Sequence, residues 1–187
     1  DAANNTYLTK NSGGSLVWAG NKTRHYISTG GYHSGSGSAG TCYGKQFSAD
    51  YHNFNTQVDP EDATNNSVNV GMKWAHMHSE FVCCNSGTIT KWVCMHGGSA
   101  SADWDLELYK LSVTTNTGAN VNPVKLGETL NLTNHSSGNK FVTKVEMGLT
   151  GTLTFADGDV LIQVLKKQTA GTKSIWWNGT LELTFDY

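Results

Sequence analysis

The chain has 187 residues, 15% of them charged, and a formal net charge of −2. A chain of this length forms one domain whose core is large enough to fold without stabilising metals or disulfides. The longest basic cluster is the pair Lys166 and Lys167, which is too small for a phosphate-binding face, so we expect no nucleic-acid partner. No apolar run approaches the length of a membrane span, so we expect no membrane insertion.

Residue composition favours strands over helices. Glycine occurs 21 times and proline twice, and Ser, Thr and Asn are abundant, whereas the residues that usually cover helix surfaces are sparse. Gly, Asn and Ser are typical of turns, while Thr, Val, Trp and Tyr are typical of strands. The composition predicts an all-β protein, an antiparallel sandwich or barrel with little or no helix.

Residues 1–66 are polar and rich in Gly and Ser. We interpret them as loops and short strands of the same domain whose core is formed by residues 67–187. Short β-like runs occur at residues 16–18 and 25–27, and residues 47–54 form either a strand or an ordered loop. The many glycines of residues 30–44 predict a long loop.

The strand signal is stronger from residue 67 onward. Residues 67–84 and 89–96 are predicted to form a hairpin around a tight turn at 85–88. In that register one face gathers core side chains, namely Met77, Phe81, Cys83, Trp92 and Cys94.

Residues 103–113 alternate in the manner of a half-buried strand, with one apolar and one acidic face. Trp104, Leu106 and Leu108 share the buried face, and Asp105 and Glu107 share the solvent face. Further strands are predicted at 140–147, 150–155, 160–166 and 181–187, which gives about eight strands in total. Residues 124–132 are the segment where a short helix is most acceptable.

Four cysteines occur, at Cys42, Cys83, Cys84 and Cys94. Adjacent residues of a strand point to opposite faces, so Cys83 and Cys84 cannot both pair with the same neighbouring strand. We favour free, buried thiols over a disulfide, with metal ligation as the least favoured interpretation.

Motifs for catalysis and for cofactor binding are missing from the sequence, so we expect a protein that is not an enzyme and binds no cofactor. Its acidic clusters, including Asp59 to Asp62 and Asp157 with Asp159, are interpreted as solvated turn residues, with calcium ligation as the alternative. His76 and His78 would share one strand face and offer metal ligands, six of them around a three-fold axis. We favour two surface histidines instead.

Aromatic residues supply the candidate binding surface. Trp176 and Trp177 are adjacent, so one of them must point outward, either into a subunit interface, which we favour, or as a stacking platform for a sugar or a partner. The Gly/Ser-rich half adds tyrosines and histidines of the kind found in adaptable recognition loops. The candidate ligand-binding residues are Tyr32, His33, Tyr43, Tyr51, His52 and Trp177.

Four segments, GTITKWVCMHGG (87–98), DWDLELYKL (103–111), LTFADGDVLIQVLKK (153–167) and WWNGTLELTFDY (176–187), give the second half of the chain a family resemblance. It resembles the jelly-roll head domains of bacteriophage fibres and virion decorations, which are similar to tumour-necrosis-factor-like and complement-head-like trimers. The resemblance implies a jelly-roll sandwich that forms a homotrimer, with the last strand near the three-fold axis.

The same resemblance implies a location and partners. Its members bind host-surface glycans or proteins, or clamp neighbouring capsid subunits, so we expect a virion-surface module assembled in the host cytoplasm, with other virion proteins as partners. The alternatives are a secreted carbohydrate-binding module or lectin, and a shell-forming jelly-roll coat protein.

Overall fold

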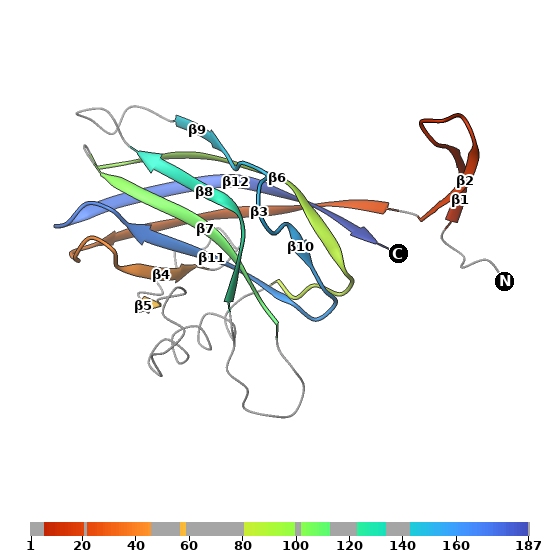
Figure 1. Ribbon diagram of the computed structural model, residues 1–187. Coiled ribbons are helices and arrows are strands. Elements are labelled where there is room, and N and C mark those ends of the chain that lie inside the picture. The colour runs from red at the N-terminus through yellow and green to blue at the C-terminus, as the bar shows by residue number, and fades with distance from the viewer. Residues whose placement is uncertain are drawn as a thin grey trace, which may run out of the picture.

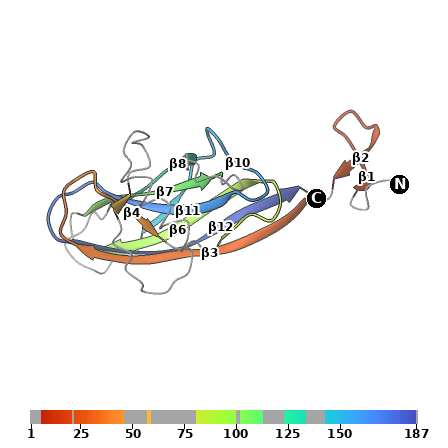
Figure 2. The same ribbon diagram turned by 90° about the horizontal axis from the view of Figure 1, so that it is seen from below.

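Two antiparallel sheets packed face to face form the body of the protein (Figures 1 and 2). The computed structural model describes residues 6–20, 22–45, 57–58, 81–99, 102–112, 123–133 and 143–186. The first sheet, here the β12 sheet, contains β3 (Lys22–Gly35), β6 (Gly87–Gly98), β9 (Thr143–Glu146), β10 (Thr154–Phe155) and β12 (Lys173–Asp186). The second, here the β11 sheet, contains β4 (Cys42–Lys45), β5 (Gln57–Val58), β7 (Asp103–Leu111), β8 (Pro123–Thr133) and β11 (Val160–Lys167).

Strand pairing defines the jelly-roll topology. β3 pairs with β12, β4 with β11, β6 with β9 and β10, and β7 with β8. Early strands therefore pair with late ones in nested order, and the chain crosses repeatedly between the two sheets, as in a double Greek key. The prediction of an all-β antiparallel sandwich of jelly-roll type is confirmed.

A separate hairpin precedes the sandwich. β1 (Thr6–Lys10) pairs with β2 (Leu16–Gly20), and the two strands lie beyond the end of the sandwich (Figure 1). Side-chain oxygen Oδ1 of Asn11 accepts hydrogen bonds from the backbone N–H groups of Gly13 and Ser15, which fixes the turn between them.

One predicted element was wrong in type, and the one segment where a short helix was allowed is a strand. Residues 30–35 belong to β3 and residues 42–44 to β4, so the glycine-rich stretch is mostly strand and only residues 36–41 connect the two sheets. Residues 124–132 lie in β8 and form no helix. In a helix Leu130 and Leu132 would point to nearly opposite sides, whereas the core buries both. Within the described part of the chain, no helix is long and apolar enough to cross a membrane.

The predicted hairpin around residues 85–88 was also wrong. Val82 bridges to Val160, and Cys83 N donates to Asp159 O at 2.8 Å, so this segment joins the β11 sheet. β6 then enters the other sheet and pairs with β12. Residues 84–86 thus connect two sheets instead of turning within one. Residues 67–80, including Met77, lie outside the described residues.

The core lies between the sheets and is dominated by tryptophan and leucine. Trp92, Trp104 and Trp177 are each 2% exposed or less. The predicted burial of Trp104, Leu106 and Leu108 is confirmed, and Cys83, Trp92 and Cys94 share this core, with Phe81 packed against it. Two of the three buried indole N–H groups are satisfied, because Trp92 donates to Thr29 Oγ1 at 3.0 Å and Trp177 to Gln163 Oε1 at 3.2 Å, whereas Trp104 Nε1 has no hydrogen-bond partner among the described residues.

Glu107 and Asp159 do not lie on a solvent face, contrary to prediction. Each is 3% exposed. Asp159 accepts hydrogen bonds from Ala156 N at 2.8 Å and Ser112 Oγ at 2.6 Å, and so closes the turn before β11. A carboxylate can be buried in this way because its hydrogen bonds replace the lost water. Alternation correctly assigned Glu107 to the face opposite the leucines, but that face is covered as well.

All four cysteines are free, and Cys42, Cys83 and Cys94 are buried while Cys84 is exposed, as the strand alternation predicts. Burial raises the pKa of the Cys94 thiol to about 12, and its contact with Thr29 offsets only part of that effect. Burial and then the nearby Asp159 carboxylate raise the pKa of Cys83 to about 12. Both thiols therefore stay protonated, and inert as nucleophiles, in the native protein.

These buried thiols make stability fall in alkaline solution. An unfolded cysteine loses its proton near its ordinary pKa of 9.0, whereas Cys94 keeps its own to about 12. The native state then binds more protons, so stability is fully present below pH 9.0 and is lost as pH rises toward 12. We expect Cys94 to contribute a loss of about 1 kcal/mol between pH 9 and pH 10, with Cys83 acting in the same direction.

Urea denaturation under reducing conditions from pH 7 to pH 10 measures this slope. Cys94→Ala is expected to flatten it, whatever its effect on stability at pH 7. Cys84→Ala removes an exposed thiol and serves as the control, with an unchanged slope. If the stability of Cys94→Ala fell with pH as steeply as that of the wild type, Cys94 would not be a source of the alkaline loss of stability.

Candidate binding surface

Trp176 and Trp177 lie side by side in β12 and point to opposite faces of its sheet. Trp177 is buried in the core, whereas Trp176 is half-buried on the outer face. One of the two does point outward, as expected, but it is Trp176, so Trp177 is not available as a platform. We call the solvent side of β3, β12 and β6 the outer face of the β12 sheet.

Each of these tryptophans covers a glycine on a neighbouring strand. Trp177 is the cross-strand partner of Gly31, and a Cβ at Gly31 would lie 2.6 Å from Trp177 Cη2. Trp176 is the partner of Gly97, where a Cβ would lie 2.4 Å from Trp176 Cζ2. Because glycine has no side chain, each of these positions leaves space for an indole. Trp177 fills that space inside the sandwich and Trp176 fills it on the outer face.

The outer face is hollowed at Asn178, two residues along β12 from Trp176, which lies beside the hollow and outside its lining. The hollow is a shallow depression of about 320 Å³. Its lining comes from three adjacent strands, namely Val93, Cys94 and Met95 of β6, Lys144 of β9, and Asn178, Gly179 and Thr180 of β12. Because Trp176, Asn178 and Thr180 alternate along one strand, all three side chains project from the same face.

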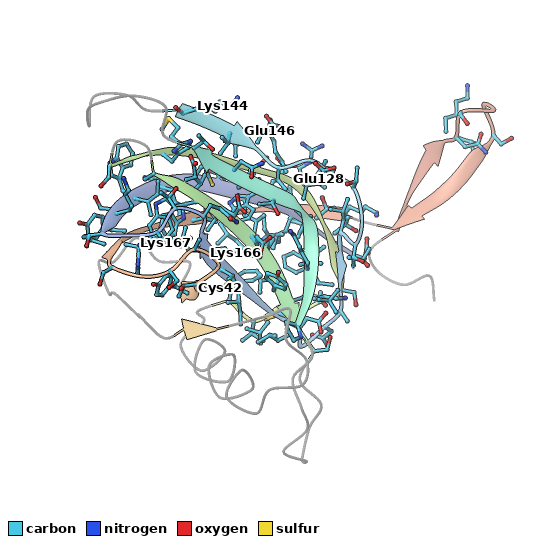
Figure 3. All side chains as sticks on the ribbon, turned by 60° about the vertical axis from the view of Figure 1, so that its left-hand side comes forward. Cys42, Glu128, Lys144, Glu146, Lys166 and Lys167 are labelled. Atoms are coloured by element: carbon cyan, nitrogen blue, oxygen red, sulfur yellow. The ribbon has the colours of Figure 1, made fainter. Side chains whose placement is uncertain are left out.

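Charged side chains also lie at the β9 rim of the hollow. Lys144 Nζ lies 4.0 Å from Glu146 Oε2, and Lys91 Nζ lies 3.6 Å from Glu146 Oε1. Lys144 and Glu146 are 66% and 49% exposed, so their ion pair is weak. Figure 3 shows both at the β9 edge, apart from Lys166 and Lys167 of the other sheet. The Lys144 ammonium is therefore available to a ligand in the hollow.

The structure separates the residues predicted to bind a ligand. Tyr32 is the cross-strand partner of Trp176 and lies half-buried on the same face. His33 and Tyr43 are core residues, with ring centroids 4.2 Å apart, and His33 also meets Trp104 at 5.2 Å. They are packing residues because β3 and β4 are strands of the sandwich and not parts of a surface loop.

Other predicted site residues cannot be placed. Tyr51 and His52, and the histidine pair His76 and His78, lie outside the described residues. Across the described ranges, no three His, Cys, Asp or Glu side chains converge in a way that would hold a metal.

Sequence reasoning missed Met95, Lys144 and Asn178. Their proximity depends on the pairing of β6 with both β12 and β9. The signal that pointed toward them was the tryptophan pair itself, with Asn178 two residues beyond Trp176. That signal could not indicate Met95 or Lys144, because their place beside β12 follows only from the strand register.

Fold and surface together define a jelly-roll protein with an aromatic, polar outer face. No family model matches the sequence, and no curated protein does. Among solved structures, a chain of Desmodium yellow mottle tymovirus is similar, with 13% identity over 90% of this chain and 85% of that one, and a TM-score of 0.24. A TM-score this low supports no inference, so the fold assignment depends on the strand pairing.

Proposed function

We propose that the chain is a non-enzymatic surface protein of a bacteriophage virion, a fibre, receptor-binding or capsid-decoration module that acts as a homotrimer in host attachment or particle stabilisation. One observation supports it above all. Among the described residues, the side chains between the sheets form one buried hydrophobic cluster, so we expect the protein to present its exterior to its partners.

Jelly rolls serve as capsid domains, as lectins and as cupins, which differ in how they use the interior. Here Trp92, Trp104 and Trp177 occupy space between the sheets, and Thr29 and Gln163 accept hydrogen bonds from the Trp92 and Trp177 indoles. An enclosed catalytic site needs room for substrate beside convergent polar groups. The hollow beside Trp176 lies instead on the outside of the fold.

Exposed apolar side chains support self-association. Tyr26 is 64% exposed, Val82 51% and Leu149 47%, and a subunit contact would remove such surface from water. A homotrimer offers three identical copies of each surface, which raises the avidity of attachment without a new contact.

Sedimentation analysis of the purified chain and mass spectrometry of purified particles from its source test this proposal. We expect the mass of three chains in solution and the chain among the virion proteins. A monomer that is absent from particles would contradict it, and with sugar binding would favour a secreted lectin. Closed shells formed by the chain alone would favour a coat protein.

A further inference from the structure

We propose that the hollow beside Trp176 binds an acidic glycan, a chain of pyranose rings that carry carboxylates. Trp176 would stack on one ring, Asn178 and Thr180 would bond its hydroxyls, and Lys144 would pair with a carboxylate. The inference rests on the attachment role in the proposed function and names the partner that this surface takes.

Trp176 gives the surface a flat apolar element. Its indole occupies the space over Gly97, and the residue remains half-buried, so part of the ring is open to solvent. One side of a pyranose ring presents C–H groups, which pack on an aromatic face while the hydroxyls stay free to form hydrogen bonds. An indole held in place by the backbone loses little entropy when it binds.

Asn178 and Thr180 supply the hydrogen-bonding groups. Both are exposed and follow Trp176 on the same face of β12, with a rise of about 6.6 Å for every two residues. The amide of Asn178 both donates and accepts, as does the hydroxyl of Thr180. This is the pattern of a sugar site, where a few directed polar groups stand beside an apolar one.

Lys144 decides the charge of the ligand. It is the charged side chain among the described residues that line the hollow, and its ion pair with Glu146 is long and exposed. A carboxylate on the sugar would form a shorter, charge-assisted hydrogen bond with the ammonium. Charge complementarity therefore favours an acidic glycan over a neutral one.

A second copy of the chain fits this face less well. A stable interface needs about 800 Å² from each partner, with an apolar centre. Around the hollow the exposed apolar side chain among the described residues is Met95, beside half-buried Val93 and Trp176, and these stand among amide, hydroxyl and ammonium groups. A polar ligand with one apolar face satisfies both kinds of group.

Isothermal titration calorimetry of the full chain tests the proposal, with hexamers of galacturonic acid, guluronic acid and sialic acid as ligands. Each is compared with its methyl ester, which keeps the rings and removes the charge. We expect at least one acidic hexamer to bind, and its ester to bind about tenfold more weakly. Absence of binding by all three at millimolar concentration would overturn the proposal.

Variants assign the roles. Trp176→Ala is expected to weaken binding of both acid and ester at least tenfold, while Trp176→Phe, which keeps a flat ring, retains most of it. Lys144→Gln should weaken binding of the acid alone. Lys22→Gln removes an exposed lysine at the far end of the sheet and is the matched control. Wild-type affinity in Trp176→Ala would refute the site.

Two further outcomes separate this inference from the proposed function. If the chain is found in particles as a trimer but binds no acidic hexamer, the glycan site is refuted and the proposed virion role stands. If the chain is a monomer, is absent from particles and binds the hexamer through Trp176, the glycan site stands and the virion role is refuted. If Trp176→Ala dissociates a trimer that binds no sugar, the face is a subunit contact and the proposal fails.

Discussion

Replacement of Gly31 by alanine is expected to lower the free energy of unfolding by about 2–3 kcal/mol, a large share of the stability of a single domain. The added Cβ would lie 2.6 Å from Cη2 and 2.7 Å from Cζ2 of Trp177. The indole cannot move aside easily, because it is 2% exposed and bonded to Gln163. Either β3 would have to move away from β12, or the Trp177 ring would have to move out of its position over residue 31.

Chemical denaturation of a double-mutant cycle measures the coupling. In a Trp177→Phe background the ring is smaller, so Gly31→Ala should cost less, with a coupling energy of about 1–2 kcal/mol. Gly13→Ala, where the nearest atom would be 3.5 Å away, is the control and should change stability little. Equal costs for Gly31→Ala in both backgrounds would show that the clash does not exist.

Local alternation was enough to predict several of the strands and many core residues. Trp104, Leu106 and Leu108 repeat every second residue, and burial of one sheet face requires that spacing. The same reasoning placed Cys83 and Cys84 on opposite sides. These predictions needed no knowledge of which strand lies beside which.

Pairing between distant strands was beyond the sequence. The glycines at 30–31 look like a loop until β12 is placed beside them, where Trp177 fills the space over Gly31. The turn at 85–88 has hairpin residues, yet the chain there passes from one sheet to the other. The candidate surface was missed for this reason, because Trp176, Met95 and Lys144 meet only through long-range register.

Glu107 shows how a charge prediction fails when the sheet face expected to meet solvent is itself buried. Tyr109 and Leu111, on the same side of β7, belong to a second buried cluster with Val160, Ile162 and Val164 of β11. Glu107 remains ionised there through three donors, which are Lys125 Nζ at 2.6 Å, Thr129 Oγ1 at 2.9 Å and Tyr109 OH at 3.0 Å. Burial alone raises the pKa of Glu107, and these contacts outweigh it, so the pKa is lowered.

Lys125→Met is accordingly expected to cost about 3 kcal/mol at pH 7, because it leaves a buried carboxylate without its cation. The lowered pKa stabilises the native state above the ordinary value of 4.5, and that contribution is lost as pH falls through the native pKa. The cost of Lys125→Met should therefore shrink between pH 7 and pH 4. Urea denaturation at several pH values measures it.

Two comparisons identify burial as the cause. The double variant Glu107→Leu with Lys125→Met should recover most of the stability that Lys125→Met loses. The attraction within a buried ion pair offsets only part of its desolvation penalty, and an apolar pair has no such penalty. Lys22→Met breaks an ion pair of 3.0 Å whose side chains are 63% and 52% exposed, and should cost less than about 1 kcal/mol. A similar loss of stability in Lys22→Met and Lys125→Met would contradict burial as the cause. It would mean that water reaches the Lys125–Glu107 pair and screens it as it screens the Lys22–Asp186 pair.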